Sequence, residues 1–243
     1  MRAAGTIRPS PLPMPAMPVL KHSVALAAAW LVSPLAHAGD ISGSATLTSD
    51  YVFRGVSQTR GKPALQAGVR FDTASGWYGA LWASRVDFGA ASDATAEVDA
   101  VAGWHGAVSK DWNADLNLTW FRYAGASEFD YVEFIATATW HERAWLMLGA
   151  SDDVFASGGR GIYAQLGTRV PLGQHVRLEL AAAHYQLREA YGRNYRHGQA
   201  TLALSLYPQI ELRLTGHATD RDARALFGDN ASPRTELSFQ ASF

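Results

Sequence analysis

Residues 112–120 read WNADLNLTW, and apolar and polar side chains alternate at every position. Successive side chains of a β-strand point to opposite faces, so this alternation predicts a strand with one apolar and one polar face. Trp112 and Trp120 lie at the two ends of the apolar face, and leucine lies between them. A bilayer favours aromatic rings at its two interfaces and aliphatic side chains in its interior. This nonapeptide is therefore typical of a strand that crosses an outer membrane.

The same alternation recurs along nearly the whole chain after residue 38 and predicts twelve strands. The alternating segments are 41–53, 65–71, 78–88, 98–104, 112–120, 132–140, 145–152, 162–170, 176–182, 200–206, 210–218 and 237–243. Of these, 145–152 is ambiguous because it is apolar on both faces. Long and short connections alternate between the segments, as they do in outer-membrane barrels. We therefore predict an all-β chain whose residues 39–243 form a single antiparallel up-and-down transmembrane β-barrel of about twelve strands, with both termini periplasmic.

The alternation alone does not say which face points inward, because a soluble lipocalin-like barrel has the same period with an apolar interior. The aromatic residues of the apolar face favour the membrane barrel, since most of them gather at strand ends. The predicted lipid-facing girdles consist of Phe71, Tyr78, Trp104, Trp112, Trp140 and Phe243 on the short-turn rim, and of Tyr51, Phe53, Phe88 and Trp120 towards the other rim. Mid-strand Trp82 departs from this pattern, and a secreted soluble β-sandwich remains as the alternative.

The polar face carries interleaved acids and bases, which suit a water-filled lumen. The charged residues predicted to line it are Asp50, Arg54, Arg70, Asp72, Arg85, Asp87, Glu97, Asp99, Asp115 and Glu133, and later strands add Arg169, Arg177, Glu179, Glu211, Arg213 and Glu236. Such charges either select solutes by charge and size or pair across strands and close the barrel. Inward aromatic residues such as Phe121, Tyr131, Tyr163 and Tyr185 would narrow a channel further. Because the acids outnumber the arginines, an open lumen would prefer cations weakly.

The composition excludes several classes of protein. The chain has no cysteine, which rules out disulfides, thiolate metal sites, a catalytic cysteine and a lipoprotein anchor. Its formal net charge is -1, which offers no electrostatic footprint for nucleic acid.

The N-terminal segment has the features of an export signal. Residues 1–38 contain Arg2, Arg8 and Lys21 but no acid, a short apolar run at 24–32, and the triplet Ala36-His37-Ala38. A basic start, a short apolar core and small residues at the cleavage positions together predict a signal peptide over residues 1–38, cleaved near Ala38.

A lipid-modifying enzyme is the rival class, because some small outer-membrane barrels cut or transfer acyl chains. Nucleophilic hydrolysis needs a serine beside a histidine, and on one face of a strand such a pair would be two residues apart. No His-x-Ser sequence occurs after residue 38, and His184, whose outward parity suits lipid chemistry best, has no serine at that spacing. Asp220, Asp222 and Asp229 do not fit a calcium-loop spacing. We therefore predict no catalytic residue, no cofactor and no metal.

Residues 47–89 contain a recognisable pattern, LTSDYVFRGVSQTRGKPALQAGVRFD at 47–72 and SGWYGALWASRVDFG at 75–89. The matching positions are Leu47, Thr48, Ser49, Asp50, Tyr51, Phe53, Arg54, Gly55, Ser57, Gln58, Pro63, Gln66, Ser75, Gly76, Tyr78, Trp82, Ser84, Val86 and Asp87. With these residues the chain resembles the proteobacterial Gcw family of conserved hypothetical proteins, also called TorF-like porins. Ala67-Gly68 stands where the family pattern has Gly-Gly, and Arg85 where it has Asn. The resemblance implies an outer-membrane barrel of porin type and supplies no established substrate.

The sequence thus predicts an outer-membrane porin or narrow channel for passive diffusion of small polar solutes, and no enzyme. The alternative is a closed structural or receptor-like barrel whose long extracellular loops bind a partner or lipopolysaccharide. The expected partners are outer-membrane lipid and lipopolysaccharide. The barrel-assembly machinery is expected to bind as well, because an alternating strand ends the chain on Phe243, which resembles the terminal signal of bacterial outer-membrane proteins.

Overall fold

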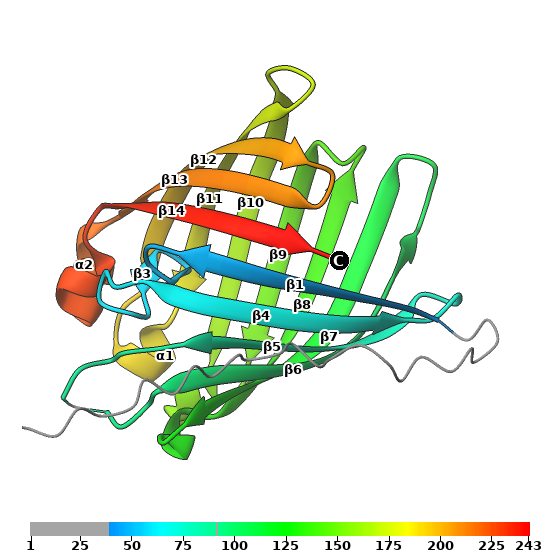
Figure 1. The fold of residues 1–243 in the computed structure, drawn as a ribbon. Helices are drawn as coiled ribbons and strands as arrows, with labels where there is room; N and C mark the ends of the chain where they lie inside the picture. Colours follow the sequence, from blue (N-terminus) through cyan, green and yellow to red (C-terminus); the bar gives the residue numbers. More distant parts are fainter. Residues whose placement is uncertain (1–38, 91) are drawn as a thin grey trace, which may run out of the picture. The chain divides into compact units, whose positions relative to one another are not determined.

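The structure is a computed structural model that describes residues 39–90 and 92–243, so the predicted signal peptide lies outside the described residues. Within these ranges the chain forms twelve barrel strands and one two-stranded hairpin (Figure 1). The barrel strands are β1 (Asp40–Thr48), β4 (Ala64–Asp72), β5 (Trp77–Arg85), β6 (Ala96–Ala107), β7 (Trp112–Ala124), β8 (Tyr131–Trp140), β9 (Ala144–Ser151), β10 (Gly161–Pro171), β11 (Val176–Gln186), β12 (Tyr195–Tyr207), β13 (Ile210–Thr219) and β14 (Arg234–Ser242). The hairpin consists of β2 (Val52–Phe53) and β3 (Val56–Ser57).

Every barrel strand pairs antiparallel with its neighbours, and β1 closes the sheet by pairing with β14. Tight turns join the strands at one end of the barrel, at 73–76, 108–111, 141–143, 172–175 and 208–209. The start of β1 and the C-terminus both lie at this short-turn end (Figure 1). The prediction of a closed, antiparallel, twelve-stranded barrel is therefore confirmed.

The long connections lie at the opposite end and contain the helices. These are η1 (Ser127–Phe129), η2 (Val154–Ala156), α1 (Arg188–Tyr191), α2 (Arg221–Phe227) and η3 (Gly228–Ala231). In the described part of the chain, no helix combines the length and the apolar character that crossing a bilayer requires.

The outer wall of the barrel is apolar and its interior is polar. Leu65 and Leu166 are 67% and 65% exposed on the outer face, whereas the inward carboxylates of Glu97 and Glu133 are buried. Of the predicted girdle residues, Phe71, Trp104, Trp112, Trp120 and Trp140 lie on the outer face, and Phe243 is exposed at the end of the chain. Hydrocarbon can solvate the apolar side chains of the outer face but not the inward carboxylates. This distribution therefore suits a barrel surrounded by lipid.

The structure corrects the predicted orientation of β5. Tyr78 and Trp82 point inward, whereas Leu81 lies on the outer face and is 54% exposed. Arg85 is exposed and pairs with Ala96, an outward position of β6, so it lies outside the lumen. The predictions that Tyr78 belongs to the girdle and Arg85 to the lumen were wrong.

Packing, rather than alternation, sets the orientation of this strand. Both parities of its sequence WYGALWASR are largely apolar, so the period of two is uninformative. Inside the barrel, the Trp82 and Tyr51 rings pack edge to face with centroids 5.3 Å apart. The Tyr78 hydroxyl donates a hydrogen bond to Asp115 at 2.9 Å. These two contacts are available only to the inward parity.

Three further predicted girdle residues lie inside the barrel or its mouth. The chain leaves β1 before Tyr51 and turns inward, so that the Phe53 ring lies 5.9 Å from the Phe121 ring. Phe88 follows the end of β5, and its ring lies 5.7 Å from that of Tyr123. The girdle predictions for Tyr51, Phe53 and Phe88 were therefore wrong, because these rings pack on inward aromatic residues instead of facing lipid.

The turn between β4 and β5 depends on Gly76. This residue has a φ of 87°, and a Cβ atom added to it would lie 2.2 Å from the carbonyl oxygen of His105. We expect Gly76→Ala to lower the free energy of unfolding by about 1–3 kcal/mol, the cost of a strained backbone position. Urea unfolding in lipid vesicles measures this change. Gly173→Ala, in a turn where a Cβ meets nothing within 4 Å, is the control; equal losses in both variants would contradict the prediction.

Candidate functional site: the lumen and the inward hairpin

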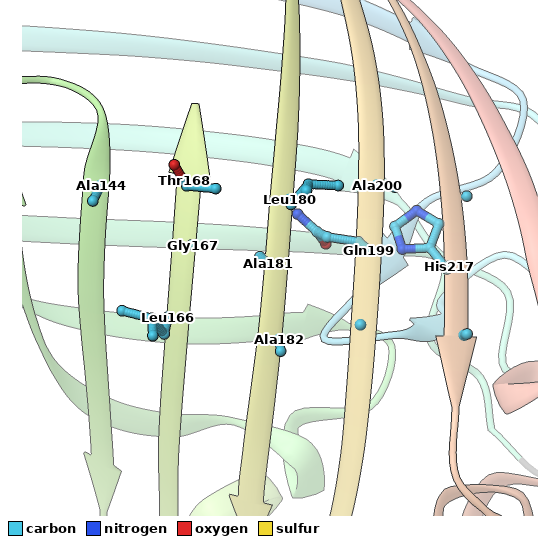
Figure 2. Close-up of a pocket in the computed structure, with 13 residues that line it drawn as sticks. Ala144, Leu166, Gly167, Thr168, Leu180, Ala181, Ala182, Gln199, Ala200 and His217 are labelled. Atoms are coloured by element: carbon cyan, nitrogen blue, oxygen red, sulfur yellow. The ribbon is translucent and has the colours of Figure 1, made fainter. Parts of the chain in front are cut away.

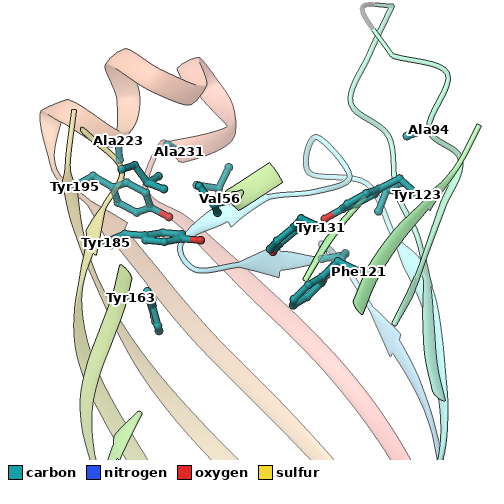
Figure 3. Packing of buried hydrophobic residues seen from close by; sticks show 14 of the residues in the cluster. Val56, Ala94, Phe121, Tyr123, Tyr131, Tyr163, Tyr185, Tyr195, Ala223 and Ala231 are labelled. Carbon is teal, nitrogen blue, oxygen red and sulfur yellow. The ribbon is translucent and has the colours of Figure 1, made fainter. Parts of the chain in front are cut away.

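The first long connection folds into the barrel as the hairpin β2–β3, residues 52–57, here called the inward hairpin. It lies between the barrel walls at the long-connection end (Figure 3). Val52 pairs with Ser57 and Phe53 with Val56, which leaves Arg54 and Gly55 as a two-residue turn. Their φ values of 49° and 83° are both positive, as a tight hairpin turn of this length requires. Arginine rarely adopts such a φ, so the contacts of its side chain must stabilise the turn.

Arg54 forms a buried, two-pronged ion pair with Glu133 on β8. Its Nη1 and Nη2 atoms donate to Oε1 and Oε2 at 2.9 and 2.7 Å. The guanidinium also lies 4.0 Å from the ring centre of Tyr163 and 4.8 Å from that of Tyr185. Paired hydrogen bonds and stacking on aromatic faces are contacts that arginine makes well and lysine does not. The turn of the hairpin is thereby fixed to the barrel wall.

Hydrogen bonds to Asp50 and from Tyr195 hold the hairpin from other sides. Asp50, at its base, accepts hydrogen bonds from the Ser57 hydroxyl at 2.5 Å, the Thr59 hydroxyl at 2.8 Å and Arg234 of β14 at 2.7 Å. The Tyr195 hydroxyl of β12 donates to the backbone carbonyl of Arg54 at 3.0 Å. The hairpin is therefore bound to three separate parts of the wall.

Asp87 belongs to the rim and not to the lumen wall, which corrects its predicted place. It lies in the connection after β5 and pairs with Lys62 at 2.7 Å and Arg60 at 3.0 Å. Hydrogen bonds from Lys62 and then Arg60 lower the pKa of the Asp87 carboxyl to about 2. The ion pairs are solvent-exposed, so added salt will weaken them. They link the first long connection to the second.

Aromatic side chains flank the hairpin on two sides (Figure 3). The Phe121 and Tyr131 rings stack at 4.5 Å, and the Tyr163 and Tyr185 rings meet edge to face at 5.4 Å. Tyr163 and Tyr185 are 1% and 0% exposed. These rings point inward, as their parity predicts. They lie at the end of the barrel that the hairpin occupies, where they reduce the cross-section of the lumen.

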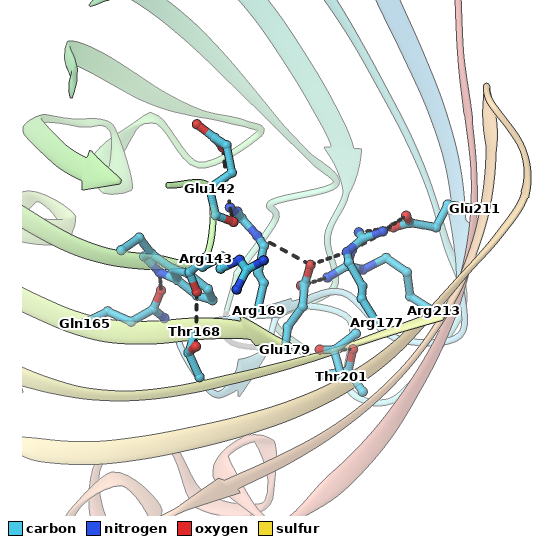
Figure 4. A network of polar contacts seen from close by, with 12 residues as sticks. Glu142, Arg143, Gln165, Thr168, Arg169, Arg177, Glu179, Thr201, Glu211 and Arg213 are labelled. Carbon is cyan, nitrogen blue, oxygen red and sulfur yellow. Dashed lines mark hydrogen bonds and ion pairs between the residues drawn. The ribbon is translucent and has the colours of Figure 1, made fainter. Parts of the chain in front are cut away.

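Nearer the short-turn end, five charged residues of the second half of the chain form one network, here called the arginine–glutamate network (Figure 4). Its members are Arg169, Arg177, Glu179, Glu211 and Arg213. Glu179 accepts from Arg177 at 2.7 Å and from Arg213 at 2.6 Å, and Glu211 accepts from the same two arginines at 2.9 and 2.7 Å. Arg169 lies 3.6 Å from Glu179.

The network bridges β11 and β13, which are not neighbours. Ala203 of β12 lies between them, opposite Arg177 in one register and opposite Arg213 in the other. Its small side chain is fully buried and leaves room for the long side chains to meet across it. The alternation identifies the inward parity of these charges, but their pairing follows from this three-strand register.

A smaller polar cluster lies on β4 to β7. Arg70 donates to Asp72 at 2.7 Å and its guanidinium lies 3.5 Å from the centre of the Tyr78 ring. Asp72 also contacts His105 at 3.0 Å, and Tyr78 connects the cluster to Asp115. These inward groups lie near the same end of the barrel as the tight turn 73–76.

The pairing leaves a surplus of acids inside the barrel. Arg54, Arg70, Arg169, Arg177, Arg213 and Arg234 each pair with a carboxylate. Among the described residues, no arginine or lysine lies within 4 Å of the carboxylates of Glu97, Asp99 or Asp115. One oxygen of Glu97 accepts from the Tyr123 hydroxyl at 3.3 Å, and the other is buried without a partner. Three inward carboxyl groups therefore have no basic partner in the described chain.

The outer wall has a shallow hollow of about 850 Å³ across β10 to β13 (Figure 2). Small outward residues form it, among them Ala182, Ala200 and Ala218. His184 lies on the same wall, but its register partners are Ala164 and Arg196, neither of which is a nucleophile. Over residues 39–90 and 92–243, no group of three metal-ligating side chains comes together.

Comparison with known proteins finds porins with a similar fold. A KdgM porin shares 7% identity at a TM-score of 0.54, with 83% of this chain and 99% of that one covered. A NanC porin shares 10% identity at a TM-score of 0.53, with 84% and 99% covered. At such identities the likeness shows the fold alone. No curated protein matches the chain. The family model described as "Bacterial protein of unknown function (Gcw_chp)" matches residues 34–228, and the chain belongs to that family, as its resemblance predicts.

Proposed function

We propose that the protein is an outer-membrane channel for passive diffusion of small polar solutes, narrowed by the inward hairpin. The observation that carries this proposal is a closed barrel with an apolar outer wall and a charged interior. Charged groups inside such a barrel interact with water and polar solutes, and the apolar wall faces hydrocarbon. The likeness in fold to porins supports the same function. The protein then acts without catalysis.

The interior favours cations over anions in this proposal. Each of its arginines pairs with a carboxylate, whereas Glu97, Asp99 and Asp115 have no basic partner in the described chain. Rings of acidic side chains are the usual source of cation selectivity in pores. One solved structure is of a KdgM porin in complex with disordered oligogalacturonate, a polyanion. The surplus of acids here favours small neutral or cationic solutes instead.

Single-channel recording tests the proposal. We expect the refolded barrel, in a planar bilayer with a salt gradient, to give stable conductance steps and a reversal potential of weak cation selectivity. Heat-denatured protein added to the same bilayer is the control. Anion selectivity at neutral pH would contradict the expected preference, and a folded barrel that never conducts would contradict the channel.

A closed structural or receptor-like barrel is the second candidate. The observation in its favour is the inward hairpin together with the aromatic rings packed around it, which occupy one end of the barrel. In that case the long connections would bind a partner or lipopolysaccharide.

Either function requires insertion into the outer membrane, where lipid and lipopolysaccharide would surround the wall. We propose that the barrel-assembly machinery recognises the last strand through Phe243. Its side chain is 80% exposed, and its backbone N–H and carbonyl both bond to Gly43 of β1. The ring is thus accessible beside the strand pair that closes the barrel.

A further inference from the structure

A cup walled by aromatic rings opens at the long-connection end of the barrel. Its volume is about 300 Å³, at the small end of the range for ligand pockets. Phe88, Tyr123 and Phe129 form one wall, with ring centroids 5.7 to 6.3 Å apart. Because these rings are tilted or edge to face, both ring faces and ring edges are available to contact a ligand.

The opposite wall comes from three other connections. The Phe155 ring lies 6.2 Å from that of Tyr191, and Tyr191 lies 6.5 Å from Phe227. Phe53 and Val56 of the inward hairpin complete the lining. Several of these rings are only partly buried, so folding leaves apolar surface open inside the cup. Binding of a ligand that covers this surface is favourable, because it removes apolar surface from water.

The cup has polar groups beside its rings, and most of them are already engaged, among them the Tyr123 and Tyr195 hydroxyls. The Ser57 hydroxyl donates to Asp50, and the Gln58 amide donates to the Val56 carbonyl at 2.9 Å. The side chain of Asn230 also lines the cup and makes no hydrogen bond within the described chain. No charged side chain of the described residues lines the cup.

These properties select one class of ligand. A charged molecule would lose its hydration without gaining an opposite charge, and a sugar would bring more hydroxyls than the cup can bond. A cation would also meet the Arg54 guanidinium, which lies 4.8 Å from the centre of the Phe53 ring. We propose that the cup binds one neutral aromatic molecule of one or two rings that carries a single hydrogen-bonding group, which pairs with Asn230.

Calorimetric titration of the folded barrel in lipid nanodiscs with indole tests the proposal, with empty nanodiscs subtracted for partition into lipid. We expect saturable binding of one indole per barrel, weakened about tenfold or more in Phe227→Ala, because one ring wall is lost. Phe134→Ala removes a ring on the outer face and should leave binding unchanged. Asn230→Leu should weaken indole but not naphthalene, which lacks the polar group.

Several results would overturn the proposal. They are the absence of saturable heat above empty nanodiscs, equal binding by the wild type and Phe227→Ala, or glucose or benzoate binding as tightly as indole. Heat-modifiable migration on gels confirms that each variant is folded. If Phe227→Ala does not fold, Phe129→Ala on the other wall has the same expected loss. Because binding is measured without current, this test is independent of whether the barrel conducts.

Discussion

Replacing Glu133 by alanine is expected to release the inward hairpin and to raise the single-channel conductance. The substitution leaves the Arg54 guanidinium buried without a counter-ion, since its side chain is only 6% exposed. Breaking a buried ion pair from one side typically costs about 3–5 kcal/mol. Hairpin release would relieve that cost, so the released population should rise by about two to four orders of magnitude. Trypsin cleavage after Arg54, followed by mass spectrometry, measures the released population.

Two controls separate this effect from general damage. Glu128→Ala removes an exposed carboxylate of η1, in a long connection, and it should change neither cleavage nor conductance. The double variant Arg54→Ala with Glu133→Ala removes both charges and should lose less stability than Glu133→Ala alone. Unchanged cleavage after Arg54 in Glu133→Ala would show that Asp50 and Tyr195 hold the hairpin without the ion pair.

The second large effect is expected on ion selectivity. Glu179→Gln combined with Glu211→Gln leaves Arg169, Arg177 and Arg213 without the carboxylates that neutralise them. These side chains are partly exposed, so the network, with three arginines and two glutamates, can become more positive without unfolding the barrel. We expect the reversal potential in a salt gradient to change sign, from weak cation to anion selectivity. Recordings near 0.1 M salt suit the test, because the Debye length is then about 10 Å.

A double variant that removes arginines instead of glutamates tests the same prediction in the opposite direction. Arg177→Gln combined with Arg213→Gln should increase cation selectivity, because the two glutamates then lack partners. Glu128→Gln, on an exposed helix of a long connection, should leave the reversal potential unchanged. If both double variants keep the wild-type selectivity, the arginine–glutamate network does not lie on the conduction path.

The sequence predicts which face of a strand a side chain occupies only where the two faces of that strand differ in polarity. In β7 one parity is polar and the other apolar, so Trp112, Trp120 and Asp115 lie on the faces that alternation predicts. In β5 both parities are apolar, and the predicted faces of Tyr78 and Arg85 were wrong. Tyr51 and Phe53 continue the alternation of β1 in sequence, but the chain turns inward before them. Alternation predicts faces only while the strand continues and only where its two faces differ in polarity.

The candidate site lies largely beyond what a local pattern can reveal. Arg54 and Glu133 are 79 residues apart, and Asp50 and Arg234 are 184 apart. Their charge and parity can be read from the sequence, but their partners depend on register and on the path of the first connection. The aromatic cup has no sequence pattern, because its rings come from separate connections that meet only at the end of the closed barrel.

The class of the fold, the approximate number of strands and the apolar outer wall can all be predicted from the amino-acid pattern. These follow from a period of two and from connection lengths, which are local properties of the chain. The face of β5, the inward hairpin and the pairing of the lumen charges depend on the closed barrel. Each of these depends on which distant groups can satisfy a buried side chain, and burial arises only when the barrel closes and brings them within a few ångströms.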